Sequence, residues 1–279
     1  MDLRVGPIEV RVIEPLKKLS IHVGDNDGGI RADLVFEARH APIQEPRFTR
    51  RQGPRMFMDY TRMTQNGAWS GTLRHNGGET RLDPAQIQGT RDRSWGIRPV
   101  GAPDAQPAPG GFQFFWLWAP FNFNDRVLFF HTNDDEAGKP WNRRAVTDVF
   151  STSRTEYEQP TAKLAFNIGT RRIKSAEIAL AADGPKLRIT PTGKHFYMNG
   201  LGYTHPTWGH GRDHGAFEAA YDVLENAEDG APGNLHIQAL AHATLEDGGR
   251  MFEGVGVLEQ LLIGPHAPSG FTSILDPAS

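Results

Sequence analysis

The chain contains 279 residues, carries a formal net charge of −3 at pH 7 and has no cysteine. The lack of cysteine excludes disulfides, thiolate catalysis, iron–sulfur clusters and thiolate zinc sites, and the near-neutral charge predicts no nucleic-acid partner. We find neither a run of about 18 apolar residues nor an apolar leader, so we expect no stable membrane insertion and a cytoplasmic location.

Turn-forming pairs and period-two runs predict an all-β chain. Glycine after Asn, Asp or Thr suits the positive φ angles of tight hairpins, and turns are predicted at 25–29, 65–67, 75–78, 183–184, 192–193, 229–230 and 247–249. Alternating or apolar runs predict strands at 8–12, 30–36, 56–63, 112–118, 126–131, 145–151, 163–168, 186–190, 216–224, 235–244 and 251–263. Only one helical turn is predicted, at 83–87, so the helical fraction should lie below about 10%.

A proline- and glycine-rich stretch predicts the domain boundary. Pro99–Gly111 holds four prolines and three glycines, and it separates a first lobe, residues 1–105, from a second lobe, residues 106–279. Both lobes carry a Trp-Gly pair close to an Arg-Asp pair, in Gly89–Arg98 and in His205–Gly215. This echo predicts two related β units whose tryptophan segments lie close in space and line one pocket.

The first of these segments is the densest polar stretch with a large aromatic residue. An aspartate among arginines stays ionised and can anchor a guanidinium. Asp92 is therefore a candidate catalytic residue, and Trp95 and Arg98 are candidate ligand-binding residues. The alternative is a structural arginine–aspartate network that fixes the interface of the lobes beneath a packed tryptophan.

The second segment contains three histidines, at positions 205, 210 and 214. Imidazole is a common zinc ligand, but this irregular spacing in a loop with proline and glycines fits no regular metal motif, so we predict no bound metal. His210 and His214 are candidate acid–base catalysts, and His205 and Trp208 are candidate ligand-binding residues. Purely structural histidines are the alternative.

Two predicted strands add further candidates. In Leu235–Thr244 one face is wholly apolar, and the other carries His236 and His242, which either line a ligand-binding lumen or face solvent. In the strand at 56–63, Tyr60 lies next to an aspartate and is a candidate proton donor, although stripes of methionine and aromatic residues more often belong to a core.

The sequence resembles one known family. Gly89–Arg98 has the pattern Gly-x-Arg-Asp-x-Ser-Trp-Gly-x-Arg, and Asn122–Asp125 and Trp208–Gly211 add support. These motifs resemble those of two-lobed lipocalin-like proteins, a family that includes carotenoid hydratases, fungal decalin-forming Diels–Alderases and uncharacterised bacterial members. The resemblance covers most of the chain and implies two consecutive antiparallel barrels or sandwiches with an apolar pocket. Such proteins usually begin with further strands, so the first lobe is expected to be incomplete or to be closed from elsewhere.

The leading interpretation is a protein that binds a hydrophobic small molecule, such as a terpenoid, polyketide or steroid-like compound, in a β-barrel pocket. The reaction implied is hydration, isomerisation or cyclisation without a cofactor. The candidate catalytic residues would move protons, while Trp95 and Trp208 would face a cationic intermediate. A non-catalytic lipophile carrier and a structural component of an export or biosynthetic assembly are the alternatives, and the oligomeric state is not predicted.

Overall fold

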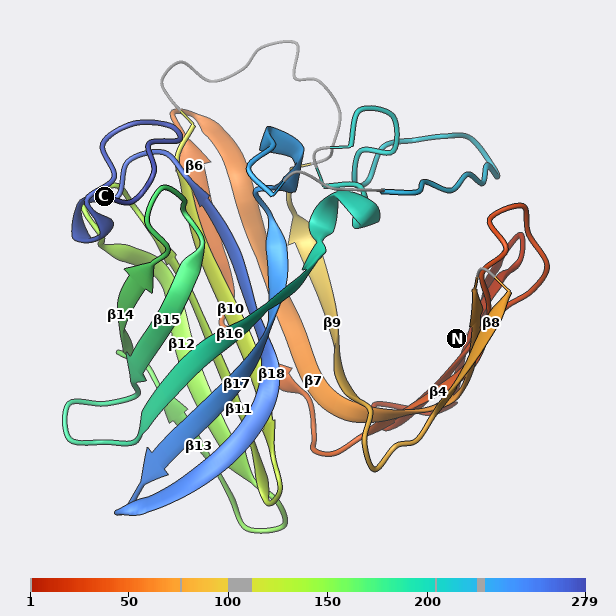
Figure 1. Cartoon of the computed structure of the whole chain (residues 1–279), viewed down its shortest axis with the longest axis horizontal. Helices are drawn as coiled ribbons and strands as arrows, with labels where there is room; N and C mark the ends of the chain where they lie inside the picture. Colours follow the sequence, from red (N-terminus) through yellow and green to blue (C-terminus); the bar gives the residue numbers. More distant parts are fainter. Residues whose placement is uncertain (1, 76, 100–111, 204, 225–228) are drawn as a thin grey trace. The chain divides into compact units, whose positions relative to one another are not determined.

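A computed structural model of the chain describes residues 2–75, 77–99, 112–203, 205–224 and 229–279 (Figure 1). Among the described residues, 59% lie in strands and 4% in helices, which confirms the all-β prediction. The short helices are the 3₁₀ turns η1 (Met198–Leu201), η2 (Pro232–Asn234) and η3 (Ala267–Ser269). Within the described ranges, no helix combines the length and hydropathy that a membrane span requires.

The chain forms two compact units, and each is assembled from three stretches. Unit 1 comprises Met1–Glu45, Arg62–Ser94 and Arg212–Asn226, and unit 2 comprises Pro46–Thr61, Trp95–Gly211 and Ala227–Ser279. The predicted boundary at residue 105 falls between 100 and 111, outside the described residues. A single cut there therefore stays a prediction.

The first nine-stranded sheet has the order β1-β2-β3-β4-β7-β5, and β6, β8 and β9 also pair with β7. Its strands are β1 (Asp2–Val5), β2 (Ile8–Glu14), β3 (Lys18–Val23), β4 (Arg31–Ala38), β5 (Ile43–Gln44), β6 (Phe48–Gln52), β7 (Arg55–His75), β8 (Gly78–Leu82) and β9 (Gln88–Ile97). The helical turn predicted at 83–87 is present as a turn, in which the Asp83 side chain accepts a hydrogen bond from the backbone N–H of Ala85.

The turn predicted at 65–67 is wrong, because these residues lie inside the 21-residue strand β7. A Cβ on Gly67 would come within 2.3 Å of the Phe36 ring and 2.6 Å of the Glu37 carbonyl oxygen. The backbone N–H of Asn66 donates to His40 Nε2 at 2.8 Å. The glycine therefore permits a close approach between neighbouring strands, and it forms no turn.

The strand predicted at 216–224 is also wrong, because this segment forms no strand. It belongs to unit 1, where two aromatic rings occupy space left by glycines. A Cβ on Gly6 would lie 2.2 Å from the Phe217 ring, and one on Gly28 would lie 3.0 Å from Tyr221 Cβ. Phe217 and Tyr221 therefore pack against glycines without strand pairing, although the apolar pattern of the segment is like that of a strand.

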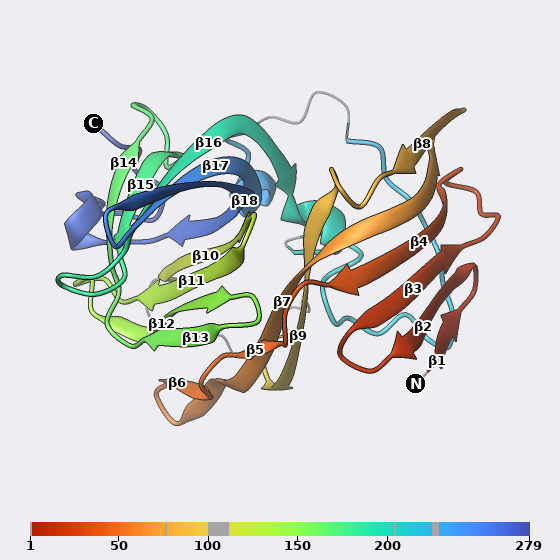
Figure 2. The same ribbon diagram turned by 90° about the horizontal axis from the view of Figure 1, so that it is seen from below.

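The sheet of unit 2 is a continuous antiparallel array in the order β13-β12-β11-β10-β18-β17-β16-β15-β14. Figure 2 shows this sheet curling upon itself. Its strands are β10 (Phe114–Phe123), β11 (Arg126–Asp134), β12 (Pro140–Val149), β13 (Ser153–Tyr157), β14 (Thr161–Phe166), β15 (Ile173–Ala179), β16 (Lys186–Tyr197), β17 (Ile237–Asp247) and β18 (Arg250–Ile263).

The inner face of this curled sheet holds the largest hydrophobic core. Alternate residues of each strand point inward, as the period of two requires. β10 contributes five buried residues, from Phe115 to Phe123, and β17 contributes Ala241, Ala243 and Leu245. The apolar face predicted for the strand at 235–244 therefore packs inward, and its His/Gln face points outward.

Candidate functional site

A buried polar cluster lies on the outer face of β10, β18 and β17 in unit 2. Glu259 of β18 pairs in register with Gln238 of β17, and Trp116 of β10 lies close by on the same face. His236 immediately precedes β17. These side chains share a face because strand residues two positions apart point the same way, opposite to the apolar core.

Glu259 is the centre of the cluster. Its Oε1 accepts hydrogen bonds from Trp116 Nε1 at 3.1 Å and from His236 Nε2 at 2.7 Å, and its Oε2 accepts one from Gln238 Nε2 at 2.8 Å. Glu259 is 7% exposed and His236 is 6% exposed. Three donors around one buried carboxyl favour the ionised carboxylate.

The carboxylate also determines how His236 can act. Because Glu259 accepts at Nε2, we assign the neutral tautomer that carries its proton on Nε2 and leaves Nδ1 as an acceptor. His236 Nδ1 is buried and has no hydrogen-bond partner among the residues that the structure describes. A carboxylate-oriented imidazole with an open nitrogen can take up a proton.

Two aromatic groups and an arginine adjoin this pair. The Tyr203 ring meets the His236 ring edge-on at a centroid distance of 5.0 Å and stacks on His210 at 4.7 Å. Arg98 Nη2 donates to the Tyr203 hydroxyl at 2.9 Å. The same guanidinium lies 5.6 Å from the centroid of the Tyr60 ring. A proton donor, Tyr203, and a proton acceptor, His236, therefore lie side by side.

Electrostatics favour a neutral His210. Burial lowers the pKa of His210, and the positive charge of Arg98 lowers it further. A neutral imidazole stacks on Tyr203 without adding a second cation beside Arg98. The cluster thus carries one guanidinium, one carboxylate and two imidazoles.

Backbone features hold these side chains in place. Arg172 donates to the carbonyl oxygens of Asn234 at 2.6 Å and Leu235 at 2.9 Å, so it fixes the chain that leads into His236. Gly202 has φ +89°, and a Cβ there would lie 2.2 Å from the Trp208 carbonyl oxygen. Only glycine allows the backbone at position 202 to come this close to Trp208 without strain. This contact brings the loop back over Tyr203.

The structure brings together four of the residues predicted from sequence: Tyr60, Arg98, His210 and His236. The contact between Arg98 and Tyr203 joins the first tryptophan segment to the loop that contains the second.

Asp92 and His214 belong to unit 1, where Asp92 is exposed on β9 and His214 Nδ1 lies 3.4 Å from Glu218. Of the two arginines that flank Asp92, Arg91 donates through Nε to Gln65 at 2.8 Å, and its guanidinium lies over Phe36. The catalytic roles predicted for Asp92 and His214 stay predictions.

Four candidate ligand-binding residues have other surroundings. Trp95 is 48% exposed, and His242 is exposed on β17. His205 Nδ1 accepts hydrogen bonds from the backbone N–H groups of Thr207 and Trp208, which shapes the loop. Trp208 is half-buried. Their ligand-binding roles also stay predictions.

Sequence reasoning missed Glu259, Trp116 and Tyr203. A signal for Glu259 was present, because Glu259 and Gln260 interrupt the apolar end of β18, and a buried carboxylate needs hydrogen-bond partners. Trp116 and Tyr203 carry no such signal, since Trp116 meets Glu259 through the pairing of β10 with β18, and Tyr203 meets its partners through the loop after η1. Across the described ranges, no group of three or more His, Asp or Glu side chains is arranged to hold a metal.

Fold and site together define an all-β protein of two lipocalin-like units, as the sequence resemblance predicted. The chain belongs to the family of unknown function DUF8625, whose model matches residues 1–272. No curated protein matches it in sequence.

Two solved structures share the fold, and a third is similar at a lower score. Kievitone hydratase from Nectria haematococca has a TM-score of 0.55 at 11% identity, and the match covers 94% of this chain and 70% of that one. A protein assigned as AttH from Nitrosomonas europaea has a TM-score of 0.51 at 12% identity, with the same coverage. CghA, solved with Sch210972, has a TM-score of 0.47 at 12% identity over 91% of this chain and 67% of that one.

Proposed function

We propose that this protein binds a hydrophobic small molecule, such as a terpenoid or polyketide, and converts it by proton transfer without a cofactor. The observation that carries the proposal is the open His236 Nδ1, oriented through Nε2 by Glu259 and adjacent to the Arg98–Tyr203 pair. Hydration is the reaction that suits this arrangement best, and isomerisation or cyclisation would use the same groups.

Hydration of an alkene needs an acid that protonates carbon and a base that deprotonates water. The Tyr203 hydroxyl accepts a hydrogen bond from Arg98, so in this proposal Tyr203 donates its proton to carbon and the guanidinium stabilises the phenolate left behind. His236 Nδ1 takes the proton from water as its oxygen adds to the carbocation. The proton then returns from His236 to Tyr203, which restores both residues.

The name of one structural neighbour supports this choice. Kievitone hydratase is by its name a hydratase, and it shares the fold of this chain. At 11% identity that likeness concerns the fold alone, so the chemistry rests on the cluster around Glu259.

The test is incubation of the purified protein with farnesol and geranylgeraniol in isotopically labelled water, followed by mass spectrometry. We expect a product heavier by one labelled water. His236→Gln and Tyr203→Phe should each lower turnover by about 100-fold or more, because each removes one proton-transfer group and keeps most of the side-chain volume.

The control is His75→Gln, which changes an exposed histidine at the end of β7, outside the cluster. It should retain wild-type turnover. Recovery of bound but chemically unchanged terpenoid from the wild-type protein would contradict the catalytic proposal and favour the non-catalytic carrier.

A further inference from the structure

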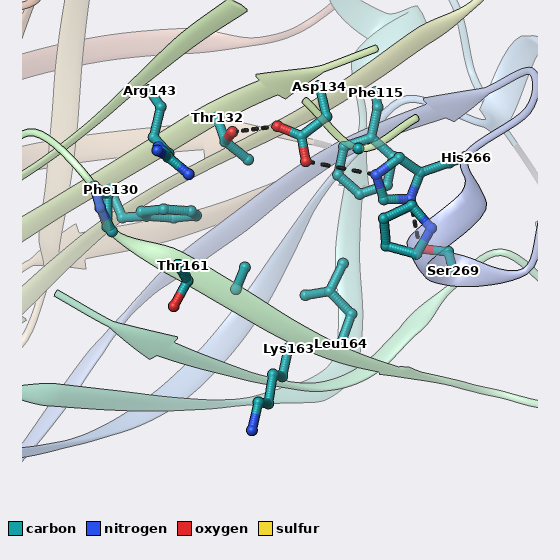
Figure 3. A pocket seen from close by; sticks show the side chains of 14 residues that line it. Phe115, Phe130, Thr132, Asp134, Arg143, Thr161, Lys163, Leu164, His266 and Ser269 are labelled. Carbon is teal, nitrogen blue, oxygen red and sulfur yellow. Dashed lines mark hydrogen bonds and ion pairs between the residues drawn. The ribbon is translucent and has the colours of Figure 1, made fainter. Parts of the chain in front are cut away.

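A second site lies at the mouth of the curled sheet of unit 2. A pocket of about 460 Å³ opens there, within the range of small-molecule sites (Figure 3). It is lined from β10, β11, β12, β14 and the segment after β18. Since β13 and β14 are the two end strands of the sheet order, the pocket spans the part of the sheet that strand pairing leaves open.

The floor of the pocket is apolar. Phe115 and Phe130 belong to the buried core, and Leu164 packs against it. These side chains can cover the body of a ring-sized ligand. They form a separate surface from the cluster around Glu259, because they lie on the inner face of the sheet.

One end of the pocket carries an acid and an imidazole. Thr132 Oγ1 donates to Asp134 Oδ1 at 2.6 Å, and His266 Nε2 lies 3.5 Å from Asp134 Oδ2. His266 is 4% exposed, stacks on Phe115 at 3.8 Å, and its Nδ1 lies 2.8 Å from Ser269 Oγ. Its Nε2 is buried and makes no hydrogen bond within the described part of the chain. A ligand hydroxyl would supply a hydrogen-bond partner for this nitrogen beside the Asp134 carboxylate.

The other end of the pocket is cationic. Figure 3 shows Arg143 beside Phe130, away from His266 and Ser269. Arg143 donates to Gln159, and in the described ranges no carboxylate forms an ion pair with Arg143 or with Lys163, which also lines the pocket. A guanidinium without an acidic partner is a ready site for a carboxylate.

We propose that this pocket binds a small hydroxyaryl carboxylate. Its carboxylate binds Arg143, its ring lies against Phe130 and Leu164, and its hydroxyl donates to Asp134 Oδ2 beside His266 Nε2. The two polar ends determine the orientation of the ligand, and the apolar floor excludes water from the ring. Binding here is independent of the reaction proposed at Glu259.

The test uses calorimetric titration of the full chain with para-hydroxycinnamate, its methyl ester and para-methoxycinnamate. We expect the acid to bind at least tenfold more tightly than the ester and than the methoxy compound. Arg143→Gln should weaken binding of the acid at least tenfold and leave binding of the ester unchanged. Asp134→Asn should reduce the preference for hydroxyl over methoxy.

The matched control is Arg81→Gln, which removes the same charge from an exposed position on β8 and should bind the acid as the wild type does. Circular dichroism of each variant shows whether the fold is retained. Equal affinity for acid and ester, an equal effect of the two arginine substitutions in folded protein, or no binding of any probe would overturn the proposal.

Discussion

At the scale of single residues, the neutral His210 is a measurable consequence of its surroundings. Burial lowers its pKa first, and the charge of Arg98 lowers it further. In NMR titrations, the His210 ring should therefore titrate below the ordinary value of about 6.5. Arg98→Gln should raise the pKa only part of the way back, because the burial remains. A pKa unchanged by this substitution would show that Arg98 does not act on His210.

The lowered pKa of His210 also determines how the free energy of unfolding changes with pH. A histidine whose pKa is lower in the folded state binds protons more readily when unfolded. Its contribution to the free energy of unfolding is therefore complete above about pH 6.5 and declines as the pH falls towards the folded-state pKa. Arg98→Gln should raise the folded-state pKa and so narrow the pH range over which this contribution declines. Denaturant titrations at several pH values across that range would measure the change.

At the scale of elements, Gly96 shows why the Trp-Gly motif needs its glycine. Gly96 has φ +126°, and a Cβ there would lie 2.3 Å from the Asp59 carbonyl oxygen and 2.7 Å from Tyr60 Cα. Both are backbone atoms that cannot move aside. Gly96→Ala should therefore lower the free energy of unfolding by about 3 kcal/mol or more, as measured by urea denaturation.

Gly53→Ala is the matched control. Gly53 also has a positive φ, +58°, but a Cβ there would meet nothing within 4 Å. This substitution should cost about 1 kcal/mol, from the backbone conformation alone. If the two variants lost equal amounts of unfolding free energy, the close approach of β9 to β7 would contribute nothing to the effect of Gly96→Ala.

The sequence predicted elements well where one face of a strand is buried. The alternation around Ala241 and Ala243 predicted both the strand and its inward face, and Asp247–Gly249 forms the predicted hairpin between β17 and β18. Prediction failed where glycine had another role. At Gly67 the glycine admits a neighbouring ring, and along 216–224 the apolar residues pack on glycines without strand pairing.

The candidate site was only partly predictable. Arg98, His210 and His236 stood out because polar residues cluster in short motifs around them. Glu259 and Tyr203 did not, since their partners are brought near by the pairing of β17 with β18 and by the turn at Gly202. Contacts of this kind depend on tertiary structure, which a local pattern does not encode.

At the scale of the whole molecule, neither unit is a continuous stretch of sequence. Residues 46–61 and Trp95–Arg98 belong to unit 2, and residues 212–224 belong to unit 1. Phe48 packs on Tyr60 at a centroid distance of 4.5 Å and on Trp141 at 5.6 Å. A cut at residue 105 would thus leave residues 1–105 without the 212–224 part of unit 1, and residues 106–279 without the 46–61 part of unit 2.

We therefore expect residues 1–105 and 106–279, produced together as two chains, to elute as one complex in size-exclusion chromatography. Residues 106–279 alone should melt at a lower temperature than this complex, because the apolar surface around Trp141 loses its contacts with Phe48 and Tyr60. Phe48→Ala in the shorter chain should weaken the complex. If the two fragments eluted separately and were each stably folded, this expectation would be wrong, and the predicted domain boundary at residue 105 would be supported.

Strand β10 has a role that constrains how the gene can change. Trp116 points to the outer face and donates to Glu259, while its neighbour Phe115 points inward and lines the pocket. If one codon were deleted after Trp116 and before the end of β10, every later residue of the strand would move from one face of the sheet to the other. Selection should therefore remove insertions and deletions from this strand far more strongly than substitutions. The same alternation of side chains places residues of both the Glu259 cluster and the pocket.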